Sequence, residues 1–199
     1  MSPLIGPLQA VARWPAYLWA SALVVGMLLF LALATRVGEV PGTLRLDRAQ
    51  LWAAGQTPDS AEPVALPHVW RNERRDWSGQ ATYRLSLPAA LAGSWDGQGL
   101  GLLIPRVGVR YRVLFNGQEL AESCWYRGEG YCDAGTHVHA VRLPSALMAP
   151  RWDDNRIDIE VRGQHLRISG LAPVLVGPWD AVQQRHRWLD WWQVDLTWM

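Results

Sequence analysis

The sequence predicts an all-β fold, an antiparallel β-sandwich with one helical segment before it and one after it. Three observations support this prediction. Short runs of alternating apolar and polar residues recur through the middle of the chain, each bounded by turn residues. One of these runs ends in Asn116-Gly117, the strongest short signal for a β-hairpin. Both ends of the chain instead carry longer segments without Gly/Pro-rich turns, which are typical of helices.

The first segment is apolar. From Trp14 to Ala34 the chain has no charged residue, and Arg13 and Arg36 flank it. This length suffices to cross a bilayer, so the sequence predicts a transmembrane helix over 14–36 with a cytoplasmic N-terminus over 1–13. A cleaved secretory signal is the alternative, because 32–34 reads "ALA", the small-x-small form of a cleavage site. Both interpretations export the rest of the chain.

Residues 37–177 form the predicted β-domain. "TLRLDRAQLWAAG" begins it with strand-like alternation, and the Pro- and Ala-rich stretch 57–67 is expected to be loop. "PSALMAP" is expected to form one helical turn, and "RWDDNR" a turn at the entry to a strand. Further strands are expected at 80–88, 99–107, 110–115, 136–144, 155–163 and 171–177.

The tail, residues 178–199, changes character. Pro178 stands at a plausible helix start, and no Gly or Pro follows it. Its tryptophans lie beside Arg185 and Arg187, which favours a membrane-proximal helix that starts a second membrane segment. An amphipathic helix docked on the sandwich is the alternative.

Composition narrows the function classes. The net charge is +1, so no charge field favours nucleic acid as a partner. The chain holds 13 tryptophans, a residue that suits cores, sugar-stacking faces and membrane interfaces alike.

The chain has 2 cysteines, Cys124 and Cys132, at the ends of "CWYRGEGYC". In an exported domain this spacing predicts a disulfide, since two thiols alone make a poor zinc site. The glycines between them permit a tight reversal of the loop.

Several motifs fall in one order: "LPHVW" (66–70), "DWSGQATYRLSLP" (76–88), "YRVLFNGQEL" (111–120) and "NRIDIEVRG" (155–163). Together they resemble the sugar-binding jelly-roll, a galactose-binding-like domain, of family-2 glycoside hydrolases such as β-galactosidase and β-glucuronidase. The same jelly-roll occurs as the extracytoplasmic sensor domain of bacterial membrane receptors of the sensor histidine kinase and diguanylate cyclase type. The resemblance covers roughly residues 43 to 177.

The resemblance implies an input domain of a bacterial membrane receptor, in the inner membrane with its main domain in the periplasm. It would bind a small molecule, a carbohydrate or an envelope protein, and pass a conformational shift across the bilayer; a homodimer is compatible with this. The alternatives are a membrane-tethered carbohydrate-binding module of a glycoside hydrolase and a structural subunit of an envelope assembly. The hydrolases keep their catalytic carboxylates in a separate barrel domain, so no catalytic residue and no cofactor are expected within these 199 residues.

Two segments supply the candidate binding residues. In the first segment, 68–79, aromatic rings would stack on a sugar while arginine provides planar hydrogen bonds. The second segment, 124–132, is the expected disulfide loop, which would lie at the rim of the jelly-roll. The candidates are Trp70, Arg71, Trp77, Trp125, Tyr126 and Arg127. Trp70 has a structural alternative, packing under the sheet. Tyr83 is expected in the core, because Ala81, Tyr83 and Leu85 share one strand face.

No metal site is predicted. His137 and His139 share a strand face, but a third ligand at a known spacing is missing. His68 has no partner that the sequence identifies.

Overall fold

The computed structural model describes residues 16–35, 42–70, 79–94, 99–123, 134–164 and 167–191. The chain divides into two compact units, Met1–Glu39 and Val40–Met199.

The described part of the first unit is one helix, α1 (Ala16–Thr35). The large side chains described on it are apolar and exposed, among them Trp19 at 54%, Leu23 at 73% and Met27 at 59%. Within the described residues no helix is long and apolar enough to cross a membrane, in contrast to the expectation of a transmembrane helix over 14–36.

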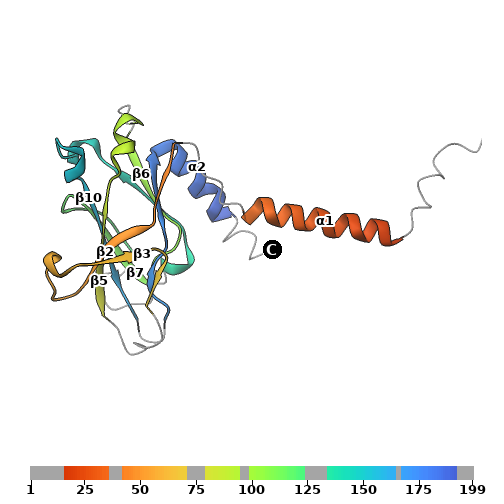
Figure 1. The fold of residues 1–199 in the computed structure, drawn as a ribbon, viewed down its shortest axis with the longest axis horizontal. Coiled ribbons are helices and arrows are strands. Elements are labelled where there is room, and N and C mark those ends of the chain that lie inside the picture. Colours follow the sequence, from red (N-terminus) through yellow and green to blue (C-terminus); the bar gives the residue numbers. More distant parts are fainter. Residues whose placement is uncertain are drawn as a thin grey trace, which may run out of the picture. The chain divides into compact units, whose positions relative to one another are not determined.

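The second unit is built on two antiparallel sheets, which confirms the predicted sandwich (Figure 1). The smaller sheet has the order β1 (Leu44–Leu46), β12 (Val174–Pro178), β6 (Leu100–Ile104) and β9 (His139–Leu143). The larger has the order β3 (Glu62–Ala65), β2 (Arg48–Ala53), β5 (Gln80–Ser86), β10 (Arg156–Arg162), β7 (Arg110–Phe115) and β8 (Gln118–Glu122). A separate two-stranded ladder joins β4 (His68–Val69) to β11 (Gly170–Leu171).

Alternation along the strands builds the core. On β5 the side chains of Ala81, Tyr83 and Leu85 are buried, as the sequence predicts, and the residues between them are not. Tyr83 pairs with Ile159 of β10, which pairs with Val113 of β7, so one row of buried side chains crosses three strands. Burying each such large apolar side chain stabilises the fold by about 1.5–3 kcal/mol.

Every residue of β6 is buried, because this strand lies between the core and a helix. Its even-numbered residues face the core, whereas Leu103 packs in a second cluster with Val182 and Leu189 of α2 (Trp179–Asp190). A Cβ on Gly101 would meet Trp179 Cε3 at 2.8 Å, so glycine lets the helix approach the sheet. The tail therefore begins at the expected place and, over the described residues, docks as an amphipathic helix, the second of the two alternatives (Figure 1).

The Asn116-Gly117 hairpin is confirmed. Both residues have positive φ, 49° and 84°, the signature of a type I′ turn. The Asn116 side chain also accepts a hydrogen bond from the backbone N–H of Arg156 at 2.8 Å, and its Nδ2 donates to Asn155 Oδ1 at 2.9 Å. The hairpin therefore fixes the start of β10 as well as its own two strands.

One prediction was wrong: the stretch 57–67 is not all loop. It contains β3, which pairs with β2 at the edge of the larger sheet. Pro63 concealed this strand, but an edge strand tolerates proline because one of its sides needs no hydrogen bond. The expected turns near 145–147 and 152–154 are present as 3₁₀ turns.

Candidate ligand-binding site

A cavity of about 730 Å³ opens beside the β4–β11 ladder, within the size range of small-molecule sites. Segments far apart in the sequence form its walls: 67–69, 106–109, 135–136 and 167–173. Apolar residues supply part of the lining, and two of them expose much of their side chains, Val69 at 49% and Ile168 at 81%.

Backbone hydrogen bonds join these walls. Trp70 N donates to Ser169 O at 2.9 Å, and Gly108 N donates to Gly170 O at 2.8 Å. Ala134 N donates to Val109 O at 3.0 Å, which ties the turn Ala134–Thr136 to the neighbouring loop. The walls are thus held in place before a ligand enters, which lowers the ordering cost of binding.

Gly170 is required where the walls meet. Its φ is +146°, and a Cβ there would collide with the backbone oxygen of His68. Only glycine permits this close approach of β11 to β4.

The polar side chains of the lining are mainly hydrogen-bond donors. Arg106 and Arg167 lie exposed at the rim, Thr136 and Ser169 add hydroxyls, and His68 adds an imidazole. None of the described lining residues is acidic. The hydroxyl oxygen of Ser169 is buried and has no hydrogen-bond partner among the described residues. This lining suits a ligand rich in acceptor oxygens.

His68 is hydrogen-bonded to Tyr83, which is in turn hydrogen-bonded to Trp70. Its Nδ1 lies 2.8 Å from the hydroxyl oxygen of Tyr83, and the same oxygen accepts a hydrogen bond from Trp70 Nε1–H at 2.7 Å. Burial lowers the pKa of His68 and raises the pKa of Tyr83, so both side chains are neutral at pH 7.

The turn Ala134–Thr136 connects the pocket to α2. His139 Nε2 donates to Ala134 O at 2.8 Å, and His186 Nε2 of α2 donates to Val138 O at 3.0 Å. Burial lowers the pKa of His139, which keeps this imidazole neutral. Within the described part of the chain, no group of three His, Cys, Asp or Glu residues is placed to hold a metal ion.

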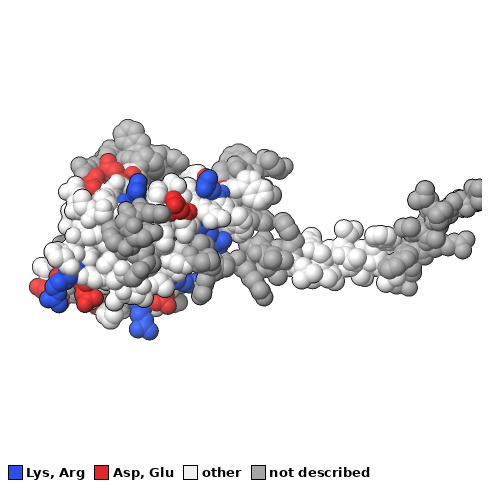
Figure 2. Space-filling model, turned by 90° about the horizontal axis from the view of Figure 1, so that it is seen from above, with Lys and Arg blue, Asp and Glu red and all other residues white. Residues whose placement is uncertain are grey.

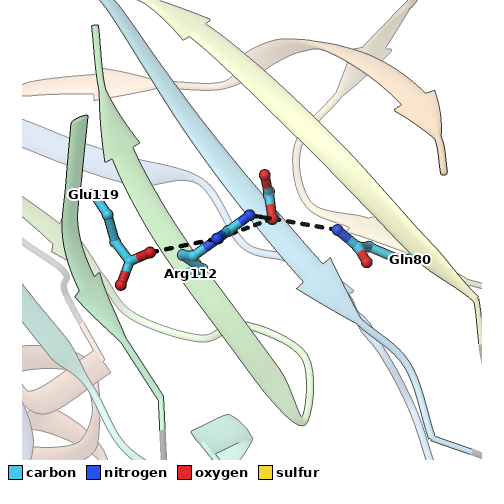
Figure 3. A network of polar contacts seen from close by, with 4 residues as sticks. Gln80, Arg112 and Glu119 are labelled. Carbon is cyan, nitrogen blue, oxygen red and sulfur yellow. Dashed lines mark hydrogen bonds and ion pairs between the residues drawn. The ribbon is translucent and has the colours of Figure 1, made fainter. Parts of the chain in front are cut away.

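A second polar cluster lies on the outer face of the larger sheet (Figure 3). Arg112 donates to Glu160 Oε2 at 2.6 Å and to Glu119 Oε2 at 3.3 Å, and Gln80 also donates to Glu160. Beside it, Arg84 forms a bidentate pair with Asp158 at 2.7 and 2.8 Å. These carboxylates are engaged by arginine, so the cluster cross-links strands.

On the face shown in Figure 2, acidic and basic residues are interspersed.

Of the predicted binding residues, only Trp70 lies within the described part of the chain. It is half-buried, packs against the core and bonds Tyr83, in keeping with its structural alternative. Arg71, Trp77, Trp125, Tyr126 and Arg127 lie outside the described residues, as do Cys124 and Cys132 with their expected disulfide.

The pocket arginines, Thr136 and Ser169 were not predicted. They come from separate loops, and no spacing in the sequence connects them. A weak signal existed for His68, which stands in the "LPHVW" motif directly before a second aromatic segment.

Comparison with solved structures gives the fold a context. No family model matches the chain, and no curated protein matches its sequence. A GH2 β-galacturonidase from Eisenbergiella tayi, solved with galacturonate bound, is 14% identical with a TM-score of 0.50 over 70% of this chain and 25% of that chain. A β-glucuronidase from Bacteroides uniformis is 14% identical, with a TM-score of 0.46 over 67% of this chain and 17% of that one. A β-D-mannosidase from Dictyoglomus thermophilum is 10% identical, with a TM-score of 0.47 over 69% and 22%.

The structural neighbours include GH2 glycosidases. The match spans a quarter or less of the length of these three proteins, and at such low identity the likeness to the β-galacturonidase shows a shared fold alone. It fits the resemblance to family-2 glycoside hydrolases drawn from the sequence motifs. The sensor-domain part of that resemblance stays a prediction.

Proposed function

We propose that the second unit is a binding module for a small, oxygen-rich ligand of the carbohydrate type, and that it acts by binding rather than by catalysis. The pocket beside β4 and β11 carries this proposal: a preformed cavity with apolar walls and convergent donors. The shared fold with part of a GH2 glycosidase is compatible with such a module but does not identify the ligand.

The ligand is further proposed to carry a carboxylate. Arg106 and Arg167 both belong to the lining, and no described lining residue is acidic. A guanidinium binds a carboxylate in bidentate geometry, so a sugar acid fits this rim better than the neutral sugar.

Calorimetric titration of the full chain with galacturonate and with galactose tests the proposal, since the two probes differ chiefly in the carboxylate. We expect galacturonate to bind about tenfold more tightly, the effect of one charge-assisted hydrogen bond. Replacing Arg106 and Arg167 together by alanine should remove this difference. Arg151→Ala is the matched control, because Arg151 is exposed and is not part of the lining. Failure of both sugars to bind, or an unchanged preference in the double variant, would overturn the proposal.

A sensing role is the second candidate, favoured by the link from the pocket to α2. The wall Ala134–Thr136 is followed by Val138, whose carbonyl accepts the hydrogen bond from His186 of α2. A ligand that favours one position of this wall would therefore shift the position of α2. Hydrogen exchange of α2 should then slow on addition of galacturonate in the native chain and respond less in His186→Ala. Binding without any change in α2 exchange would remove this role.

The partner of α1 is proposed to be a lipid surface, since the helix exposes large apolar side chains. Co-flotation with phosphatidylcholine vesicles tests this. The native chain should float with the vesicles, and a variant with Leu23, Val24 and Leu28 changed to serine should not. Equal flotation of both chains, or of neither, would contradict the assignment.

A further inference from the structure

We infer that Trp70 and Tyr83 fix His68 in the tautomer that carries its proton on Nε2, so that the pocket wall presents an N–H donor to the ligand. The tautomer follows from the hydrogen bonds of His68 and Tyr83 alone, whereas the contact of Nε2–H with a ligand rests on the proposed function. It assigns Tyr83 as a positioning residue for His68, because it acts through the imidazole without lining the pocket.

The first step concerns the hydroxyl of Tyr83. Its side chain is fully buried at 0% exposure, and its oxygen already accepts the indole N–H of Trp70 at 2.7 Å. The phenolic proton still needs an acceptor, and a buried O–H without one costs about 1–3 kcal/mol. The atom at hydrogen-bond distance is Nδ1 of His68, at 2.8 Å.

The second step follows from the chemistry of imidazole. A neutral ring has one donor and one acceptor nitrogen, and the hydrogen bond at one nitrogen sets the role of the other. If Tyr83 donates to Nδ1, then Nδ1 is the acceptor and Nε2 carries the proton. In the opposite tautomer, the Nδ1–H of His68 and the indole N–H of Trp70 would both point at the Tyr83 oxygen. The phenolic proton of Tyr83 would then have no acceptor.

The third step places Nε2 at the cavity. His68 is half-buried and belongs to the pocket lining. Nε2 bonds no described residue. Among the described residues, the fully buried side-chain atoms without a partner do not include Nε2, so part of its surface is accessible. The edge of the ring opposite the Tyr83 bond is therefore free to meet a ligand.

The consequence is a selectivity rule. With Nε2–H at the wall, beside Ser169 and the two rim arginines, the favoured ligand presents an acceptor oxygen to His68. A ligand group that offers only donors would oppose the imidazole N–H and bind poorly.

Nitrogen-15 NMR of the full chain, labelled at histidine, tests the tautomer without any ligand. At pH 8 we expect the His68 signals of a protonated Nε2 and an unprotonated Nδ1, and in Tyr83→Phe a shift toward a mixture of tautomers. Trp70→Phe provides a second route to the same test, since removing the indole donor frees the Tyr83 oxygen to accept from Nδ1. A protonated Nδ1 in the native chain, or unchanged signals in both variants, would overturn the inference.

Titration with galacturonate separates this inference from the proposed function. Tyr83→Phe should weaken binding by about 3- to 10-fold, the worth of one oriented hydrogen bond, while Tyr111→Phe leaves it unchanged. If the tautomer is found as inferred and galacturonate does not bind, the proposed ligand is wrong and the role of Tyr83 stands. If galacturonate binds equally to native and Tyr83→Phe chains, His68 does not contribute its donor to the ligand.

Discussion

The hydroxyl oxygen of Tyr83 lies 2.8 Å from Nδ1 of His68, which joins the centre of the sandwich core to the wall of the pocket. Tyr83 stands in the middle of β5, paired with Ile159, and is fully buried. The position of the imidazole therefore depends on the packing of the core.

Removing this hydroxyl should destabilise the fold. Tyr83→Phe leaves the indole N–H of Trp70 and Nδ1 of His68 without their partner, at a cost of about 1–3 kcal/mol. Urea denaturation of the full chain measures the change. Tyr111→Phe is the matched control, because Tyr111 is also buried and no described residue bonds its hydroxyl. Equal losses in the two variants would show that the hydrogen bonds do not contribute.

Protonation of His139 should contribute to a loss of folding stability in mild acid. Burial lowers its pKa in the folded chain below the ordinary value of about 6.5. The unfolded chain therefore takes up the proton first, so the contribution is complete above about pH 6.5 and is lost as the pH falls through the folded pKa.

The variant His139→Gln tests this pH dependence, since its amide can still donate to Ala134 O. The decrease in urea midpoint between about pH 7.5 and 5.5 should be smaller than in the native chain. A native-like profile in His139→Gln would exclude His139 as the source.

A methyl group added at Gly101 of β6, where α2 packs against the sheet, should destabilise the fold. In Gly101→Ala the added Cβ would lie 2.8 Å from Trp179 Cε3 and 2.9 Å from Val182 Cβ. Overpacking of this kind costs about 1–3 kcal/mol and should change the fluorescence of the α2 tryptophans. Gly26→Ala is the control, since nothing lies within 4 Å of its added Cβ. Native stability in Gly101→Ala would contradict the observed packing of α2 on β6.

The Arg84–Asp158 pair should contribute measurably to stability. Its side chains are only 20% and 17% exposed, and Arg84 lies over the ring of Trp52 at 4.8 Å. A double-mutant cycle to alanine should give a coupling of about 1 kcal/mol or more. The exposed pair Arg151–Asp154, at 3.9 Å, should give less than about 0.5 kcal/mol. Similar couplings for both pairs would contradict the assigned role of burial.

The sheet architecture could be predicted because its signals are local. Alternation on β5, β7 and β10 shows which side chains are buried, and Asn116-Gly117 defines a turn by its backbone preference alone. β3 was missed since its Pro63 is acceptable only at an edge, a position that depends on the completed sheet.

The pocket could not be predicted in the same way. Arg106, Thr136 and Ser169 meet only after strands from both sheets have paired, so no spacing along the sequence connects them. The sequence offered two roles for Trp70, a sugar contact and packing under the sheet, and in the structure its ring packs against the core and donates a hydrogen bond to Tyr83.

Methyl NMR of the full chain during titration with galacturonate tests the binding proposal most directly. With galacturonate raised to about 10 mM, which detects affinities of about 1 mM, the methyl signals of Val69, Val107, Ile168 and Leu171 should shift together with one dissociation constant. The methyls of Leu85 and Ile157, buried in the core away from the lining, should move little. If the four pocket signals stay fixed while others move, or if no signal moves, the pocket is not the binding site for a sugar acid.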